Sequence, residues 1–452
     1  MSQILATIGP ASENLSNIKK IFKFTNFVRI NGAHNSIKWH EKISKKIKKV
    51  NPDSIILIDF PGIKPRTLNS DNIVINKNEK IVFKYSSNVY KKKNLKRNYV
   101  LISKPLPKFG KTNFFSLSDG KYLFKYLKHG KNYLEGKSLQ KFILLPKKGL
   151  NIPNSIFNNN IQEKIYIDFI KKIRKVRYDA IGLSYVQDSK IIEKIKTITK
   201  KIIVSKIENK LGCENVDKIC KSSDAIMIDR GDLSAEVGDH NLFKETLNIS
   251  QNTKKNGKLL IMATENLETM ITNASPSKSE IISLSFSNSL NVDYFMLSDE
   301  TATSKKFENI LKWLKKFNIV NISNKNNQIK KLEKDLFYNN LKELDHRNSI
   351  IVIFTRKGYV IEKILKTNPR FNLVVFTDNK KIHTISKLRL NVDSYNTYKF
   401  QKNMDSFIYN NIKKRKKSIF KKNHAVFLVY AAFARKKSRA NTLTIIEDAD
   451  FI

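Results

Sequence analysis

Eight short, mostly apolar segments, separated for the most part by helical patterns, limit the fold of this chain more than any other feature. Apolar runs of this kind between polar neighbours predict buried strands. Strands that alternate with helices predict parallel βα units, and eight such units can close into a (β/α)8 TIM barrel. The continuous apolar character also fits strands that are buried on both faces. The predicted strands span residues 4–8, 27–30, 54–58, 180–183, 202–205, 225–228, 259–262 and 294–297, and the predicted helices include 36–50, 163–176, 188–199 and 243–256.

Two intervals depart from this alternation and predict further domains. The first is rich in Lys and has short alternating runs with turn signals, such as Asp119-Gly120, which predict a small all-β module inserted into the barrel. The second has strand patterns at 350–354, 373–376 and 426–430 with helical patterns at 359–366 and 404–417 between them, which predict a separate α/β domain. The expected domains are a discontinuous barrel at 1–67 and 149–322, an inserted β-barrel lid at 68–148 and a C-terminal α/β domain at 323–452.

The net charge raises the question of a polyanionic partner. The chain has 85 Lys and Arg residues against 40 Asp and Glu residues, a formal charge of +45. Only 13 of the 85 basic residues are Arg, the residue whose planar fork suits specific base and phosphate recognition. Because the Lys residues are scattered over the whole chain, we expect no specific nucleic-acid partner. Compositional drift and a selected basic face both remain open as explanations.

Other compositional features indicate an intracellular protein. Cys213 and Cys220 are the two cysteines, and their spacing fits neither a disulfide framework nor a zinc site. The longest apolar run, residues 425–434, is about half of the roughly 20 residues that a membrane span needs. No signal peptide precedes the first predicted strand. We therefore expect a cytoplasmic protein without a membrane partner.

Polar and charged residues follow the predicted strands, at the end of a barrel where enzymes of this fold carry their chemistry. Glu208 and Asp232 follow neighbouring strands, so both side chains could reach one Mg²⁺ ion. The cations Arg29, Arg66 and Lys206 on the same rim suit charge spread over a phosphoryl group. Spacing alone leaves other interpretations open, namely surface ion pairs for the carboxylates and a solvent-reaching lysine at 206. Thr264 and His34, each taken alone, are more often structural.

Several of these strand ends match motifs of one enzyme family, in the family's order, over about residues 4–302. The chain resembles the pyruvate kinase family. The segment Lys148-Gly149-Leu150-Asn151-Ile152-Pro153 also resembles the family's return from its lid into the barrel. The matching motifs are Ala6-Thr7-Ile8-Gly9-Pro10-Ala11-Ser12, Arg29-Ile30-Asn31, Lys206-Ile207-Glu208-Asn209, Arg230-Gly231-Asp232-Leu233, Ala263-Thr264, and Met296-Leu297-Ser298 with Glu300-Thr301-Ala302.

The resemblance implies Mg²⁺-dependent phosphoryl transfer from phosphoenolpyruvate to ADP, which gives pyruvate and ATP. By the family pattern, Glu208 and Asp232 hold Mg²⁺, with Mn²⁺ as an alternative ion. Backbone N–H groups at Arg230, Gly231 and Asp232 donate hydrogen bonds to the substrate carboxylate. The resemblance also implies a homo-oligomer, commonly a tetramer. The remaining roles are Lys206 and Arg29 at the transferring phosphoryl group, Thr264 in substrate binding and proton delivery, and Pro10, Asn31, His34 and Arg66 on the nucleotide side.

One departure from the family pattern concerns a monovalent cation. Potassium-dependent members have Ser two residues after Asn31 and Glu five residues after Asp59, whereas this chain has Ala33 and Lys64. A fixed ammonium group at Lys64 could replace the bound K⁺ electrostatically, so we expect that K⁺ is not required. The alternative is that Lys64 points to solvent.

Further departures leave two other functions open. Gln187 stands where the family often has Arg, after a Ser-Phe-Val-like segment that is Ser184-Tyr185-Val186 here, and Asp229 and Glu265 are additional carboxylates. The chain could be a divergent paralogue that acts on another 2-oxo acid or enol phosphate at the same Mg²⁺ site. It could also be a catalytically weak homologue that binds polyanions through basic tracts. The tracts are Lys413-Lys414-Arg415-Lys416-Lys417 and the cluster at residues 91–97.

Overall fold

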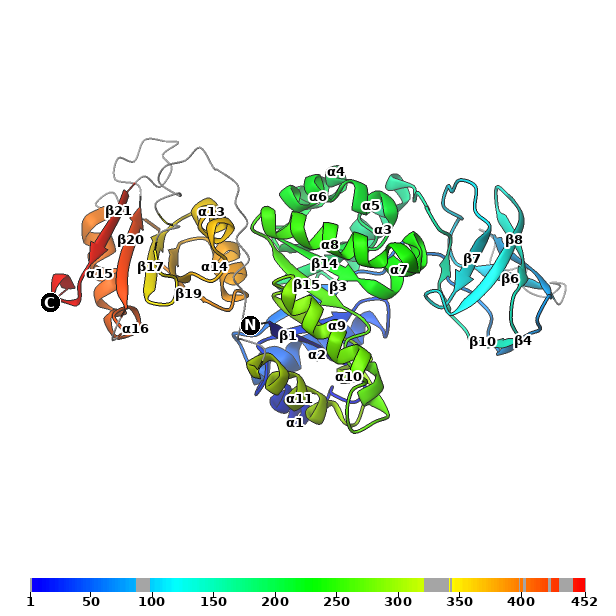
Figure 1. Ribbon diagram of the computed structural model, residues 1–452, viewed down its shortest axis with the longest axis horizontal. Coiled ribbons are helices and arrows are strands. Elements are labelled where there is room, and N and C mark those ends of the chain that lie inside the picture. Colours follow the sequence, from blue (N-terminus) through cyan, green and yellow to red (C-terminus); the bar gives the residue numbers. More distant parts are fainter. Residues whose placement is uncertain are drawn as a thin grey trace.

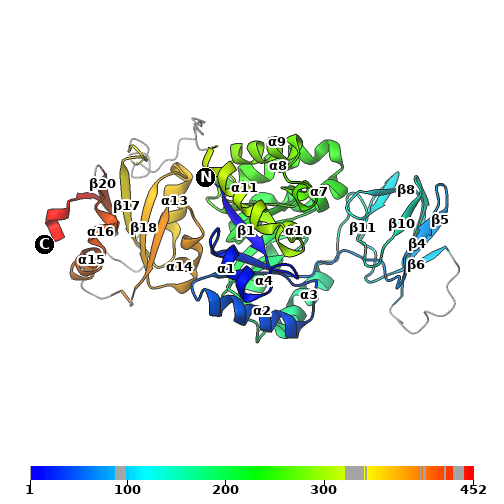
Figure 2. The ribbon, with the colours of Figure 1, turned by 90° about the horizontal axis from the view of Figure 1, so that it is seen from below.

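The structure is a computed structural model and describes residues 2–86, 98–320, 341, 344–397, 399–400, 404–421, 424–430 and 442–451. The basic cluster at residues 91–97 lies outside the described residues. Three bodies follow one another along the longest axis of the molecule, and two views at right angles agree on their order (Figures 1 and 2). A barrel lies in the middle, with an inserted all-β body on one side and a C-terminal α/β body on the other.

The barrel closes from eight parallel strands, so the fold expected from the alternating pattern is confirmed. Every predicted strand is present, with bounds that differ by at most two residues. The order around the barrel is β1-β16-β15-β14-β13-β12-β3-β2. The strands are β1 (Gln3–Thr7), β2 (Phe27–Asn31), β3 (Ile55–Asp59), β12 (Ala180–Leu183), β13 (Ile202–Ile207), β14 (Ala225–Asp229), β15 (Leu259–Ala263) and β16 (Tyr294–Leu297).

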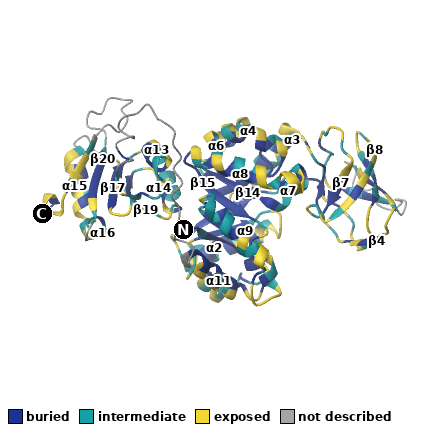
Figure 3. Ribbon diagram, in the orientation of Figure 1, coloured by how far each residue is buried: buried dark blue, intermediate teal, exposed yellow. Residues whose placement is uncertain are grey.

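Helices surround these strands, which lie buried beneath them (Figure 3). Two helices begin earlier in the structure than the sequence predicts. Helix α3 starts at Asn159, directly after its N-cap Asn158, and α8 starts at Asp239. The Asn158 side chain accepts hydrogen bonds from Asn160 and Ile161, a cap that lies ahead of the first apolar residues on which the prediction rested. The barrel helices are α1 (Leu15–Ile21), α2 (Ile37–Val50), α3 (Asn159–Lys172), α4 (Ser189–Ile198), α5 (Lys210–Glu214), α6 (Val216–Ser222), α7 (Arg230–Val237), α8 (Asp239–Lys255), η2 (Glu268–Ile271), α9 (Lys278–Ser289), α10 (Asp299–Ala302) and α11 (Phe307–Val320).

Strand alternation explains how the barrel positions charged groups. Successive side chains point to opposite faces of a strand, so every second residue points into the barrel. The inward set is apolar at the amino ends of the strands, with Phe27, Leu57, Val204 and Met227 among its members. The same register becomes polar at the carboxyl ends, where the residues two positions further on are Arg29, Asp59, Lys206 and Asp229.

The inserted body is all-β, as predicted, and lies at the carboxyl ends of the barrel strands. Its larger sheet has the order β11-β7-β8-β9-β5-β6 and a second sheet pairs β10 with β4. The two chain crossings lie side by side, because Thr67 N donates to Lys148 O and Arg66 pairs with Gly149. Although the sequence assigns residue 149 onward to the barrel, β11 pairs with β7 and so completes the inserted sheet. The strands are β4 (Ile73–Ile75), β5 (Lys80–Tyr85), β6 (Tyr99–Ile102), β7 (Phe114–Leu117), β8 (Tyr122–Gly130), β9 (Tyr133–Ser138), β10 (Phe142–Leu144) and β11 (Leu150–Asn151).

The C-terminal body is a mixed five-stranded sheet, ordered β19-β18-β17-β20-β21, with only β21 antiparallel. Helix α15 ends at Lys413, and a short helix follows it, so the single predicted helix at 404–417 is interrupted. The elements are β17 (Ser349–Phe354), α13 (Tyr359–Thr367), β18 (Asn372–Thr377), α14 (Lys380–Lys387), β19 (Val392–Asn396), α15 (Met404–Lys413), α16 (Lys416–Ile419), β20 (Ala425–Tyr430), β21 (Thr442–Ile446) and η4 (Asp448–Phe451).

The C-terminal body closes the amino end of the barrel. Leu388, 2% exposed, packs within the apolar cluster that fills the barrel interior. Its carbonyl oxygen accepts a hydrogen bond of 2.5 Å from the hydroxyl of Tyr294, on β16. Arg389 donates to Gly257 O at 2.7 Å, and Lys258 pairs with Glu362 at 2.7 Å. The barrel and the C-terminal body therefore share part of one core.

We expect Leu388→Ala to lower the free energy of unfolding by about 2–5 kcal/mol, because the change leaves a cavity among side chains that already fill the barrel floor. Denaturant unfolding measures the loss. Leu390→Ala is the matched control, because Leu390 is 47% exposed and its truncation opens no buried space. Equal losses for the two variants would contradict this account of the junction.

Candidate active site

The ammonium group of Lys206 lies at the centre of the carboxyl-end rim of the barrel. Its Nζ atom is 2.8 Å from Glu208 Oε1, 3.3 Å from Asp229 Oδ2 and 3.4 Å from Asp59 Oδ2. The side chain is 6% exposed, so the alternative of a solvent-reaching lysine is wrong. Arg29 joins the group from β2, because its Nη2 atom lies 2.7 Å from Asp59 Oδ2.

Burial and the neighbouring charges shift the pKa values of these side chains in opposite directions. Burial disfavours the charged form of Lys206, but Asp59, Glu208 and Asp229 raise the pKa of its ammonium group well above the ordinary value. Burial likewise raises the pKa of Glu208 to about 8, although the adjacent Lys206 opposes that shift. For Asp59, Lys206 and Arg29 outweigh burial and lower the pKa of the carboxyl group. A further cation at Glu208 would favour the ionised form that burial disfavours.

Three carboxylates could hold one metal ion here. Glu208, Asp229 and Asp232 each offer an oxygen atom, and these atoms lie within 4.8 Å of one another. Glu208 is 1% exposed, so a surface ion pair does not describe it, whereas the side chain of Asp232 is 20% exposed and pairs with Lys64. Hard oxygen donors at such mutual distances fit a divalent cation such as Mg²⁺, which takes few protein carboxylates and keeps other positions for water and substrate. The metal pair that the sequence indicates therefore gains Asp229 as a third member.

Lys64 connects the inserted body with this cluster. Its Nζ atom lies 2.5 Å from Asp232 Oδ1 and 2.5 Å from Asp119 Oδ1, and its side chain is 4% exposed. The alternative that Lys64 points to solvent is therefore wrong. A Cβ atom at Gly149 would lie 2.4 Å from Lys64 Cε, so any larger residue here would displace the Lys64 side chain from its present position. Asp59, part of the expected monovalent-cation region, pairs with Arg29 and Lys206.

Thr264 and the first turn of α7 lie beside the carboxylates. Thr264 Oγ1 donates to Asp229 Oδ1 at 3.2 Å and accepts from Gly231 N at 3.1 Å. Thr264 has φ +60°, a conformation that is uncommon outside glycine and that often marks a functional turn. The Arg230 side chain donates to Thr264 O, Glu265 O and Asn266 Oδ1, so it fixes the turn after β15.

The residues predicted for the nucleotide side lie around the same rim but are more open. Pro10, His34 and Arg66 are exposed, and Asn31 is half-buried. Partial burial of the His34 ring and the nearby charges of Arg66 and Arg29 lower the pKa of this histidine. Arg66 Nη1 also donates to Lys147 O at 3.2 Å.

Tyr185 is a site residue to which the sequence alone gave no role. Its backbone N–H donates to Glu208 Oε2 at 2.5 Å, and its hydroxyl donates to Asp232 Oδ1 at 2.8 Å. The signal that could have located it is its place two residues after β12 ends at Leu183, on the same rim as the charged residues.

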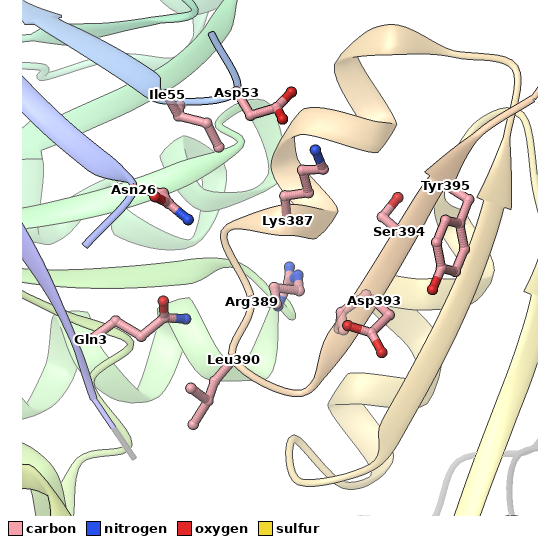
Figure 4. Close-up of a pocket in the computed structure, with 11 residues that line it drawn as sticks. Gln3, Asn26, Asp53, Ile55, Lys387, Arg389, Leu390, Asp393, Ser394 and Tyr395 are labelled. Carbon is pink, nitrogen blue, oxygen red and sulfur yellow. The ribbon is translucent and has the colours of Figure 1, made fainter. Parts of the chain in front are cut away.

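A pocket lies at the other end of the barrel. A pocket of about 420 Å³ is formed at the amino ends of the barrel strands, between Gln3, Asn26 and Asp53 of the barrel and Lys387 and Arg389 of the C-terminal body (Figure 4). It is remote from the carboxyl-end rim where the charged cluster lies. Across the described residues, no helix is both long enough and apolar enough to cross a bilayer.

The fold and the rim define a class of protein. A TIM barrel with buried carboxylates, an ammonium group and a guanidinium group at the carboxyl ends of its strands is an enzyme scaffold suited to anionic substrates. The family model described as "Pyruvate kinase, barrel domain" matches residues 1–309. The chain belongs to the pyruvate kinase family.

Individual relatives agree with this assignment. A pyruvate kinase from Thermococcus litoralis is 30% identical over 319 residues, which cover 67% of this chain and 66% of the relative. One from Thermoplasma acidophilum is 29% identical, covering 67% of this chain and 55% of the relative. The chain thus spans less than two thirds of the length of these relatives. A longer match, at 26% identity, covers 85% of both this chain and a pyruvate kinase from Buchnera aphidicola.

Solved structures show the same fold. A pyruvate kinase from Cryptosporidium parvum superimposes with a TM-score of 0.78 over 98% of this chain and 95% of that chain, at 21% identity. One from Pyrobaculum aerophilum gives a TM-score of 0.76 over 98% of this chain and 99% of that chain, at 19% identity. The likeness therefore extends over all three bodies.

Proposed function

We propose that this chain is an active pyruvate kinase, which transfers the phosphoryl group of phosphoenolpyruvate to ADP and yields pyruvate and ATP. The single observation that supports this best is the placement of Lys206 Nζ within 3.4 Å of Asp59, Glu208 and Asp229 on the barrel rim. That geometry lets one ammonium group and one metal ion face the same small anion.

Glu208 and Asp232 are the proposed ligands of Mg²⁺, with Asp229 close enough to join them and Mn²⁺ as an alternative ion. When bound, the ion would supply positive charge to the substrate carboxylate and phosphoryl oxygens. Lys64 and Tyr185 both bond to Asp232 Oδ1, which leaves Oδ2 as the free oxygen of that carboxylate.

The chain's own groups perform the remaining work. Lys206 and Arg29 stabilise charge on the oxygens of the transferring phosphoryl group. Backbone N–H groups in the first turn of α7, which begins at Arg230, bind the substrate carboxylate, as the positive end of a helix dipole favours. Thr264 helps to deliver a proton to the enolate that remains, and its hydroxyl is held there by Asp229 and Gly231. Pro10, Asn31, His34 and Arg66 line the nucleotide side.

A coupled assay tests this function directly. The chain is incubated with phosphoenolpyruvate, ADP and Mg²⁺, and pyruvate is measured through its reduction. Turnover that requires all three components supports the proposal. Metal binding without turnover of phosphoenolpyruvate would favour a divergent paralogue at the same site, and the absence of both would favour a binding homologue.

We also propose that Lys64 makes K⁺ unnecessary. Its buried ammonium group supplies a fixed positive charge between Asp119 and Asp232. Adding KCl to a tetramethylammonium buffer is therefore expected to leave the turnover of the unsubstituted chain unchanged. Lys64→Met removes the fixed charge, so this variant should lose turnover and regain part of it with KCl. The control is Lys121→Met, an exposed lysine two residues from Asp119, which should behave like the unsubstituted chain. Strong K⁺ activation of the unsubstituted chain contradicts the proposal.

The domain boundaries and the assembly are proposals as well. We infer a barrel at residues 1–67 and 149–322, a lid at 68–148 and a C-terminal domain at 323–452, with β11 (Leu150–Asn151) adding one strand to the lid sheet from just beyond the boundary. The adjacent crossings at Thr67 and Lys148 support the first two boundaries. Family resemblance supports a cytoplasmic homo-oligomer, and sedimentation of the purified chain tests the oligomeric state.

A further inference from the structure

Tyr185 bonds to both carboxylates proposed as metal ligands, and it does so through different parts of the residue. The backbone N–H donates to Glu208 Oε2 at 2.5 Å, whereas the phenol hydroxyl donates to Asp232 Oδ1 at 2.8 Å. Glu208 follows β13 and Asp232 lies in the first turn of α7, so one residue after β12 spans two other elements. The second oxygen atom of each carboxylate, Glu208 Oε1 and Asp232 Oδ2, makes no hydrogen bond to Tyr185.

The backbone of Tyr185 adopts a conformation that serves both bonds. Its φ of +60° is a genuine outlier for an aromatic residue and persists only where the surroundings determine it. The turn directs the N–H group to one carboxylate while the ring extends toward the other.

The ring is held by packing on both sides of the lid crossing. Tyr185 is 2% exposed and forms a small apolar cluster with Ile63, which precedes Lys64, and with Phe157 beyond β11. The Phe157 and Tyr185 rings meet edge to face, with centroids 5.1 Å apart. This packing fixes the hydroxyl relative to both carboxylates.

We propose that Tyr185 is a positioning residue of the metal site, which orients Glu208 and Asp232 for a divalent cation before the cation binds. The inference rests on the proposed function for the identity of the metal ligands. Groups that hydrogen-bond to ligands and fix their orientation act in this way, and their loss typically lowers metal affinity about 10–100-fold.

The test compares two phenol-to-phenyl variants that remove the same oxygen atom. Tyr185→Phe removes the bond to Asp232 and keeps the ring and the backbone N–H. Tyr294→Phe is the matched control, because Tyr294 is similarly buried and its hydroxyl donates to a backbone oxygen, Leu388 O, at the opposite end of the barrel. Mn²⁺ affinity is measured by electron paramagnetic resonance of free Mn²⁺, which needs no substrate turnover, and thermal unfolding is recorded without metal.

Tyr185→Phe is expected to lower Mn²⁺ affinity about tenfold or more, with turnover regained in part at saturating Mn²⁺. Tyr294→Phe is expected to change only the thermal unfolding. Mn²⁺ affinity of Tyr185→Phe equal to that of the unsubstituted chain overturns the inference and leaves the proposed function intact. Mn²⁺ binding by the unsubstituted chain without pyruvate kinase turnover would refute the proposed function. A loss of Mn²⁺ affinity in Tyr185→Phe would then still support the inference. If the unsubstituted chain binds no Mn²⁺, the metal site is refuted and the inference with it.

Discussion

Lys206→Met is expected to lower the turnover of phosphoenolpyruvate by at least about 10³-fold, since a cation at the transferring phosphoryl group contributes on the order of 10³–10⁵ in rate. The ammonium group also balances Asp59, Glu208 and Asp229, all within 3.4 Å of Nζ. Its removal should therefore lower the free energy of unfolding by several kcal/mol as well, about 3–5 kcal/mol for the loss of one partner of a buried ion pair. Steady-state kinetics and denaturant unfolding measure the two effects separately.

The control for Lys206→Met is a lysine at the other end of β13. Lys201 precedes β13 at the opposite end from Lys206, and its Nζ atom lies 4.9 Å from the centroid of the Tyr178 ring. Lys201→Met should leave turnover close to that of the unsubstituted chain, because this lysine is remote from the rim. Retention of most turnover by folded Lys206→Met would refute the assignment of Lys206.

Glu208→Gln is expected to reduce metal-dependent turnover by about 100-fold or more, because it replaces a charged ligand with a neutral amide while keeping the shape of the side chain. The amide oxygen can still accept the hydrogen bond from Tyr185 N, so the turn after β12 should keep its conformation. Turnover as a function of Mg²⁺ concentration is the measurement, with Mn²⁺ affinity as a second one.

Glu236→Gln is the matched control for Glu208→Gln. Glu236 is equally buried, at 1% exposed, and burial raises its pKa to about 8, as for Glu208. It lies outside the group of three carboxylates that can share a metal ion. If the two variants lose turnover equally, the loss follows from changing any buried acid near the rim, and the role of Glu208 as a metal ligand is contradicted.

The sequence predicts the barrel well because each strand is a continuous apolar run. Such a run indicates a strand buried on both faces without any knowledge of its particular neighbours. The same runs also place the candidate site, because a change from apolar to charged residues, as from Val204 to Lys206, marks the carboxyl end of a strand. Helix starts are less predictable, as α3 shows, because a polar cap at Asn158 decides where that helix begins. The spacing of apolar residues does not show which polar residue caps a helix. Only the residue type at position 158 points to the cap.

Partners of side chains are the part of the site that the sequence does not contain. Lys64 and Asp119 are 55 residues apart, and their contact depends on how the inserted body meets the barrel rim. The bonds of Tyr185 depend on a positive φ, which residue type argues against. Asp229 stood out only as an additional charge, and its inward register on β14 makes it a neighbour of Glu208 and Asp232.

The way in which Leu388 fills the floor of the barrel has a practical consequence. If heat or denaturant unfolded the C-terminal part alone, apolar side chains of the barrel such as Leu5 and Tyr294, which are otherwise buried, would become exposed to water. The two parts should accordingly melt in one cooperative transition. A shortened gene product that stops after α11 would then be prone to aggregate, whereas excision of the lid, whose ends already lie side by side, should be tolerated far better.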